Sequence, residues 1–322
     1  MTDLMSPCER KDYLGDQTQL ERLFTAIDQN NLLNGWLVTG GEGTGKATLA
    51  YLLARRLLGN SEQSNNLVAN ASHPDLFVAE RLYDEKKGVY ASEIKIETIR
   101  KLNSFLNHTP SMGGWRIAII DTADDLNRNA ANALLKVLEE PPQKTTLFLL
   151  SASPGRLLPT IRSRCRKIDL RPLSGDKIRS FLEGEGLQAN DEVIAAAKGR
   201  PGYAASLVGG PGADAIKLAN EFVTKAPTGD IMPIVQLLSL KSNDELWPYF
   251  KSFLLQGLND AIRIDAISKD SNTSIESMIK VYDEIGSLFA KGEAINTDRG
   301  QMLLQAARLL SRMPDSGVAR GA

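Results

Sequence analysis

The sequence has 322 residues, which at about 150 residues per domain is enough for two or three compact domains. Its 38 Lys and Arg against 39 Asp and Glu give a formal net charge of −1, which excludes a general electrostatic attraction to nucleic acid or anionic membranes. Two cysteines, Cys8 and Cys165, and two histidines fit no zinc or Cys-x-x-Cys spacing, so zinc modules, disulfide scaffolds and dithiol redox enzymes are excluded.

The N-terminal residues show no basic segment followed by an apolar core, as a secretory signal would. No apolar run approaches the roughly 18 residues that a membrane span needs. We therefore expect a soluble, cytoplasmic protein without a membrane partner.

The first half of the chain alternates helical and strand patterns. Apolar residues at helical spacing predict a helix around residues 20–27, and a short apolar strand over residues 36–39 leads into a glycine loop and a second helix that ends before Gly59. The small polar residues from Asn60 to Ser72 predict a surface loop rather than a helix or strand.

Further strands are expected over residues 76–78, 117–121, 146–150 and 168–170. Between them, Ser92 is a candidate cap for a helix with buried residues up to Leu106, and Asn127 opens a helix that must end at Glu140 because two prolines follow. This alternation predicts a doubly wound parallel sheet whose ligand lies at the carboxyl ends of the strands.

After Pro172 only helical patterns remain. Ser174 and Asn190 are candidate starts of two short helices, and residues 209–212, Gly-Gly-Pro-Gly, form the clearest linker. The helical stripes beyond the linker carry no glycine motif and no acidic cluster.

The glycine loop has most features of a phosphate-binding loop. Backbone amides at Gly40, Gly43 and Gly45 and the start of the following helix favour an anion, and Lys46 can reach the β- and γ-phosphates of a nucleotide. Residue 47 is Ala where a hydroxyl should ligate magnesium, and Thr48 lies about 100° further round the helix, so it cannot simply substitute. The residues leave nucleotide binding open, and an ordinary glycine-rich turn is the less favoured reading.

The strand over residues 117–121 ends in a second feature typical of nucleotide sites. Asp121 is the carboxylate expected to hold the magnesium shell, but Thr122 follows where a glutamate should activate water. Asp124 and Asp125 are expected to cap or solvate the next turn rather than replace that base. The defects at residues 47 and 122 together argue against ATP hydrolysis by this chain.

A basic run just before the last predicted strand places four cations in six positions, at Arg162, Arg164, Arg166 and Lys167. A solvated edge explains any one of these side chains. For the set, an anionic partner is favoured, because clustered like charges destabilise unless something offsets them. A guanidinium delivered to a neighbouring subunit's γ-phosphate would suit an oligomeric nucleotide-dependent assembly.

The sequence resembles the clamp-loader branch of the AAA+ proteins, specifically over about residues 14–210. The stretches that carry the resemblance are Gly45-Lys46-Ala47-Thr48-Leu49-Ala50, His73-Pro74-Asp75-Leu76, Ile120-Asp121-Thr122-Ala123-Asp124, residues 129–142 (NAANALLKVLEEPP) and residues 158–165 (LPTIRSRC). The helical C-terminal part is less diagnostic, although Asn296-Thr297-Asp298-Arg299 resembles a stretch of the same family.

This resemblance implies a RecA-like AAA+ P-loop domain with a parallel sheet over residues 1–172, a small helical lid over 173–212 and an all-α collar domain over 213–322. It implies a hetero-pentamer with motor (tau/gamma) subunits and a delta subunit, acting on a sliding clamp and primed DNA. The lone chain is expected to contact DNA weakly, because its net charge is near zero.

The resemblance also implies site residues. Arg164, in Ser163-Arg164-Cys165, matches the arginine finger that acts in trans on a neighbour's ATP. Residues 151–153 match the first sensor, and Gly202 stands where an active motor carries the second sensor's arginine. Many relatives hold a structural zinc through four cysteines that are absent here, so no zinc or other metal is expected. No cofactor is required, and ATP or ADP binding at a degenerate loop of Gly40, Gly43, Gly45, Lys46, Thr48 and Asp121 stays possible.

The residues and the resemblance are compatible with three functions. The substitutions at residues 47, 122 and 202 favour a subunit that lends Arg164 to a neighbour and is itself neither a polymerase nor an active ATPase. The alternatives are a catalytic clamp-loader ATPase and a nucleotide-free interaction scaffold whose loop is vestigial.

Overall fold

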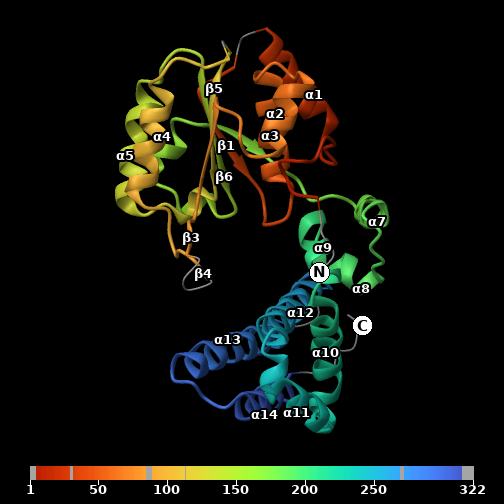
Figure 1. Cartoon of the computed structure of the whole chain (residues 1–322). Coiled ribbons are helices and arrows are strands. Elements are labelled where there is room, and N and C mark those ends of the chain that lie inside the picture. The colour runs from red at the N-terminus through yellow and green to blue at the C-terminus, as the bar shows by residue number, and fades with distance from the viewer. Residues whose placement is uncertain (1–4, 30–31, 85–88, 113, 269–271, 314–322) are drawn as a thin grey trace. The chain divides into compact units, whose positions relative to one another are not determined.

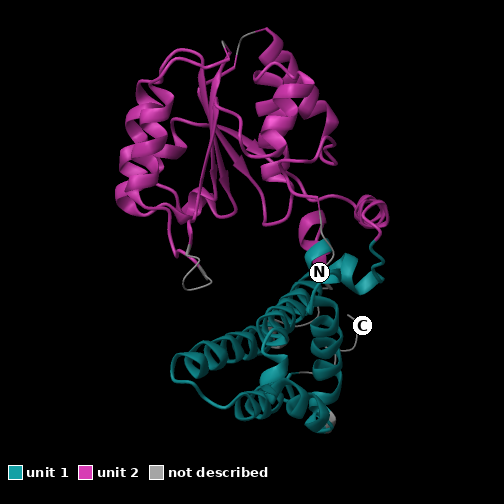
Figure 2. Ribbon diagram, viewed as in Figure 1, with its two compact units in different colours: residues 1, 187–196, 205–322 teal, residues 2–186, 197–204 magenta. Residues whose placement is uncertain are grey.

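The computed structural model describes residues 5–29, 32–84, 89–112, 114–268 and 272–313. The chain forms two compact units (Figure 2). The first, here called the α/β unit, contains residues 2–186 and 197–204, and the second, the helical unit, contains residues 187–196 and 205–322. The finer division at residues 172 and 212 stays a prediction.

The α/β unit is built on a parallel five-stranded sheet in the order β2-β5-β6-β1-β7. Strand β1 lies between β6 and β7, so that Val38 lies opposite both Leu150 and Ile168. All five strands predicted from the sequence are confirmed: β1 (Gly35–Thr39), β2 (Leu76–Glu80), β5 (Arg116–Asp121), β6 (Thr145–Ser151) and β7 (Arg166–Asp169). A separate hairpin is formed by β3 (Tyr83–Asp84) and β4 (Val89–Tyr90).

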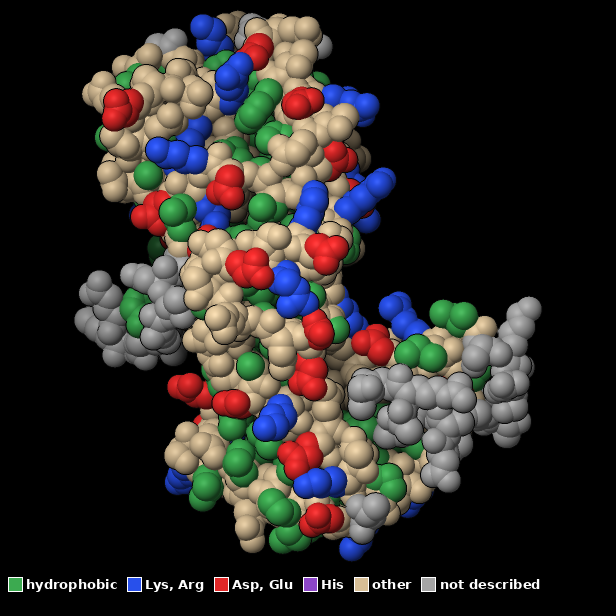
Figure 3. Space-filling view, turned by 90° about the vertical axis from the view of Figure 1, so that its right-hand side faces the viewer, with side chains coloured by type: hydrophobic (Ala, Val, Ile, Leu, Met, Phe, Trp, Pro, Cys, Tyr) green, Lys and Arg blue, Asp and Glu red, His purple; other side chains and the backbone are tan. Residues whose placement is uncertain are grey.

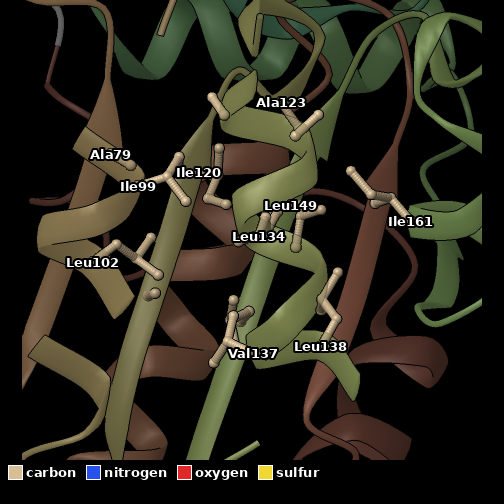
Figure 4. Packing of buried hydrophobic residues seen from close by; sticks show 14 of the residues in the cluster. Ala79, Ile99, Leu102, Ile120, Ala123, Leu134, Val137, Leu138, Leu149 and Ile161 are labelled. Carbon is tan, nitrogen blue, oxygen red and sulfur yellow. The ribbon is translucent and has the colours of Figure 1, made fainter. Parts of the chain in front are cut away.

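Helices cover both faces of this sheet (Figure 1). On one face lie α1 (Gln17–Asp28), α2 (Lys46–Leu57) and α3 (Glu62–Ala69), and on the other α4 (Ile96–Leu106) and α5 (Arg128–Glu139). Alternate strand residues serve the two cores: in β5, Ile117 and Ile119 pack on the α1–α2 side, and Ile120 packs with α4 and α5 (Figure 4). Burial on both faces explains why the strands read as continuous apolar runs.

Two predicted local features are wrong. The segment from Asn60 to Ser72 contains the helix α3, because Ser61 caps it by accepting a hydrogen bond from Ser64 N (3.2 Å) and because Ser64 and Val68 are buried. Ser92 does not cap α4, whose N-cap is Lys95. The preceding Ile94 is held in an extended bridge to Leu126, with Ile94 N donating to Asp125 O at 2.7 Å, which delays the helix start.

The segment that follows β7 contains the short helices α7 (Gly175–Gly184), α8 (Asp191–Ala197) and α9 (Pro201–Val208). As predicted, α7 starts after Ser174, and Asn190 caps α8 by accepting a hydrogen bond from Val193 N at 3.0 Å. A short helix, α6 (Pro159–Arg162), precedes β7.

The following helices build most of the helical unit: α10 (Gly212–Lys225), α11 (Met232–Ser239), α12 (Leu246–Ser268), α13 (Asn272–Ala294) and α14 (Arg299–Leu310). Aromatic side chains join three of them, since Phe222 of α10 and Trp247 of α12 both lie against Phe250, and Trp247 also contacts Phe289 of α13. Among the described residues, no helix is both long enough and apolar enough to cross a membrane.

Candidate functional site

The predicted phosphate-binding loop forms where β1 meets α2. Gly43 and Gly45 adopt positive φ angles of 76° and 90°, which a residue with a Cβ tolerates poorly. Gly45 is the N-cap of α2, so the backbone amides at the start of that helix are free of a capping side chain. Lys46 Nζ donates to Gly40 O at 2.8 Å and to Gly41 O at 2.9 Å, which holds the lysine across the loop.

Lys46 and Asp121 face each other across this site, at the carboxyl edge of the sheet. Burial lowers the pKa of Lys46, and the nearby carboxylates of Asp121 and Asp124 offset part of that effect. Burial raises the pKa of Asp121, against the opposing influences of Thr122 and Lys46. The fold thus brings the predicted residues of the loop and of β5 near each other at this edge of the sheet, although β6 lies between β1 and β5. Thr48 lies half-buried in the first turn of α2, next to Ala47.

The segment that resembles the second sensor closes over this loop. Gly202 N donates to Gly43 O at 2.9 Å. A Cβ atom on Gly43 would lie 2.3 Å from Tyr203 N, and a Cβ on Gly202 would lie 3.2 Å from Gly43 Cα. Arg200 covers Gly41, and its guanidinium lies 4.0 Å from the ring centre of Tyr203. The missing side chain at residue 202 is therefore what permits this backbone-to-backbone contact.

Asp124 has a different role from the one expected. Its carboxylate accepts hydrogen bonds from Ser151 Oγ (2.6 Å), Ala152 N (2.6 Å) and Ser153 N (3.1 Å). It therefore ties down the segment that resembles the first sensor, not the turn that follows β5. Asp125 pairs instead with Arg81, at 3.1 Å. The Thr122 hydroxyl bonds the Asp121 carboxylate at 3.3 Å and offers no base for activating water.

Arg164 lies at the opposite end of β1 from the phosphate-binding loop. A Cβ on Gly35, the first residue of β1, would lie 3.2 Å from Arg164 O. The Arg164 guanidinium pairs with Glu139 at the end of α5, with Nη2 2.7 Å from Oε1, and its side chain stays 36% exposed. Of the other cations in the basic run, Lys167 pairs with Asp169 at 3.4 Å, so part of the clustered charge is offset within the chain.

The chain is similar to known subunits of DNA polymerase III. A family described as DNA polymerase III, delta subunit, matches residues 15–174. A DNA polymerase III subunit delta' of Escherichia coli (strain K12) is 30% identical over 256 residues, which cover 76% of this chain and 74% of that protein. The chain belongs to the DNA polymerase III delta-prime family.

Other relatives of this delta-prime family member match over shorter spans. A subunit delta' of Pseudomonas aeruginosa is 36% identical over 182 residues, which cover 52% of this chain and only 53% of that protein. A tau subunit of Escherichia coli is 29% identical over 180 residues, 53% of this chain and 27% of that protein. A solved gamma subunit-related protein of Thermotoga maritima is 16% identical and covers 91% of this chain and 98% of its own, with a TM-score of 0.45.

The predicted fold class is confirmed: a RecA-like AAA+ P-loop domain with a parallel sheet, followed by helical segments. The sequence did not reveal Glu139 or Arg200 as neighbours of the site, although both lie in stretches already singled out, residues 129–142 and 199–202. Their contacts join segments far apart in the chain, and no local spacing encodes such contacts.

Proposed function

We propose that this chain is the delta-prime, or stator, subunit of a DNA polymerase III clamp loader. It lends Arg164 to the ATP site of a neighbouring motor subunit and helps to load the sliding clamp onto primed DNA in the cytoplasm. Its partners in the hetero-pentamer are tau/gamma motor subunits and a delta subunit. The chain itself is neither the polymerase nor an active ATPase.

One observation carries this proposal: Arg164 is exposed to solvent, whereas the chain's own nucleotide site lacks residues needed for hydrolysis. Arg164 is 36% exposed at the start of β1. At the other end of β1, Ala47 supplies no hydroxyl for magnesium, Thr122 after β5 supplies no base, and Gly202 N donates a hydrogen bond to Gly43 O of the loop. This combination fits a subunit that supplies an arginine finger to a neighbour and does not itself hydrolyse ATP.

The surface charge agrees with a role that depends on partners. On the face shown in Figure 3, the described Lys and Arg side chains are interspersed with Asp and Glu instead of gathering in one basic patch. That face therefore offers DNA no clustered positive charge, on which attraction to the phosphate backbone depends. DNA binding belongs to the assembled complex.

The test is the ATPase of a complex reconstituted from this chain with its motor and delta partners. In GTPases an arginine finger contributes about 10³- to 10⁵-fold in rate, so Arg164→Ala should abolish turnover at one motor site and lower the clamp- and DNA-stimulated rate measurably. Arg22→Ala, which removes an exposed arginine of α1 outside the basic run, is the matched control and should leave the rate unchanged. An assembled Arg164→Ala complex with the parent rate would refute the proposal.

Separate observations favour each of two alternative functions, a catalytic ATPase subunit and a nucleotide-free scaffold. The intact glycine geometry and the position of Lys46 favour nucleotide binding, and steady ATP turnover by the pure chain that is lost in Lys46→Ala would support a catalytic subunit. The contact between Gly202 and Gly43 favours a nucleotide-free scaffold, in which a labelled ATP analogue at millimolar concentration fails to bind. We expect no turnover, and binding only if residues 200–203 move off the loop.

A further inference from the structure

Two close acceptors hold Arg164 through different nitrogens of its guanidinium, and Ser163 Oγ is a more distant third at 3.5 Å from Nη1. Nη2 lies 2.7 Å from Glu139 Oε1, and Nη1 donates to Thr160 O at 3.0 Å. The backbone beneath is also fixed, because Arg164 N donates to Ile161 O at 3.1 Å and Ile161 is fully buried. The plane of the guanidinium is therefore defined by the chain itself.

These contacts leave part of the guanidinium available. A guanidinium carries five N–H groups, and the two short contacts use one on each terminal nitrogen. Among the described residues, Arg164 Nε has no hydrogen-bond partner. The side chain is thus oriented and still able to donate to an incoming anion.

The position of Glu139 is not explained by helix stability. Glu139 is the last residue of α5, where the helix dipole disfavours a negative side chain. The side chains of Arg164 and Glu139 are 36% and 48% exposed, and exposed pairs add little to folding stability. What the pair does provide is a second fixed point for a long side chain that Thr160 O already holds at Nη1.

We propose that Glu139 is a positioning residue for Arg164, aligning its guanidinium toward the γ-phosphate held by the neighbouring subunit. This inference rests on the proposed function of Arg164 as a finger in trans. A charged donor held in place before the reaction needs no reorganisation when charge develops on the transferred phosphoryl group. Glu139 itself touches no reacting atom.

The first experiment measures kcat and KM for ATP in the reconstituted, clamp- and DNA-stimulated complex. Glu139→Gln keeps the shape but removes the charge that holds the guanidinium. Since misplacing a catalytic group by 1 Å can cost about 10²-fold, we expect this partial loosening to lower kcat by about fivefold with KM little changed. Glu140→Gln, the exposed neighbouring carboxylate, is the matched control and should retain the parent kcat.

A double variant separates positioning from an independent effect. Combined with Arg164→Ala, Glu139→Gln should lower kcat no further than Arg164→Ala alone, because the two residues act as one unit. An additive loss, or a Glu139→Gln complex with unchanged or raised kcat, overturns the inference. If Glu139→Gln is silent while Arg164→Ala is impaired, only the inference fails. If Arg164→Ala is silent too, the proposed function fails with it.

A second measurement uses the lone full-length chain. In nitrogen-15 spectra, a held guanidinium shows slow rotation of its Nη groups and separate signals for them. We expect such signals for Arg164 in the parent chain and in Glu140→Gln, and their collapse to fast rotation in Glu139→Gln. Fast rotation already in the parent chain would overturn the inference independently of any partner.

Discussion

Gly202 N donates a hydrogen bond to Gly43 O at 2.9 Å, and a Cβ on Gly202 would lie only 3.2 Å from Gly43 Cα. The phosphate-binding loop is thereby in direct backbone contact with the segment that resembles the second sensor. A side chain at residue 202 would press on this contact, because the atoms nearest to its Cβ belong to the backbone of Gly43.

The first prediction concerns this contact. A Cβ on Gly202 would lie 3.2 Å from Gly43 Cα and 3.3 Å from Gly43 O, both backbone atoms that cannot turn aside. We expect Gly202→Ala to lower the free energy of unfolding by about 1–2 kcal/mol, although alanine is the better helix former. Urea unfolding measures it. Gly184→Ala, a helical glycine of α7 with open space around it, should be neutral or stabilising, and equal losses in both variants would contradict the packing argument.

The second prediction concerns the anchoring of residues 151–153. Asp124→Ala removes the acceptor of three hydrogen bonds, two of them at 2.6 Å. We expect a loss of about 2 kcal/mol in urea unfolding, because hydrogen bonds to a charged group are the stronger ones. The adjacent Asp125→Ala breaks only an exposed pair with Arg81 and should cost less than about 1 kcal/mol. Similar losses for both would show that Asp124 does not anchor the segment.

The third prediction concerns the buried carboxylate of the His73-Pro74-Asp75-Leu76 stretch. Asp75 is 1% exposed, accepts from Ser111 N (2.7 Å) and Met112 N (2.8 Å), and lies 3.6 Å from Arg116 Nη2. Asp75→Ala leaves the Arg116 charge buried without its counter-ion, so we expect a loss of about 3–5 kcal/mol. The control is Asp28→Ala, which removes an exposed pair with Arg56 and should lie within about 1 kcal/mol of the parent. A small loss for Asp75→Ala would mean that the buried arginine finds other acceptors.

The fourth prediction is the pH dependence of the thiol beside the finger. Burial raises the pKa of Cys165 from 9.0 to about 11. Because the folded-state pKa is raised, the stabilising contribution of the neutral thiol is complete below pH 9.0 and is lost as the pH rises through about 11. In a Cys8→Ser variant, iodoacetamide should therefore label Cys165 slowly at pH 8 and faster as the pH approaches 11, whereas urea-unfolded protein labels readily at pH 8. Rapid labelling of the folded variant at pH 8 would contradict this.

Local pattern was enough to predict the sheet and the loop. The strands lie between two layers of helices, so every residue from Ile117 to Ile120 is apolar, and such a run predicts a buried strand from the local sequence alone. The phosphate-binding loop is a contiguous motif, and so is the proline stop after Glu140. The helix α3 was missed because its polar composition hides two buried positions, Ser64 and Val68, behind a serine cap.

What the sequence could not supply are contacts between distant segments. Gly202 meets Gly43, Asp124 reaches the end of β6, and Glu139 meets Arg164, each through the tertiary arrangement of the sheet and its loops. Asp124 in particular looks like a turn residue of its own segment, and only the pairing of β5 with β6 brings it to residues 151–153. Sequence motifs located the site, but the tertiary fold determines which of its side chains already have hydrogen-bond or ion-pair partners within the chain.

The two ends of strand β1 carry different features of the α/β unit. Arg164 lies beside Gly35, the first residue of the strand, and the phosphate-binding loop begins at Gly40, directly after the last residue, Thr39. About 13–17 Å of strand therefore separates the arginine from the loop. Domains that repeat such a contact assemble head to tail, and the resulting row has a direction and two different termini. If the proposed function holds, this chain supplies an arginine at one end of β1 and has an impaired nucleotide site at the other, so it stands at one end of the row of subunits. The features that set this position lie at opposite ends of one five-residue strand.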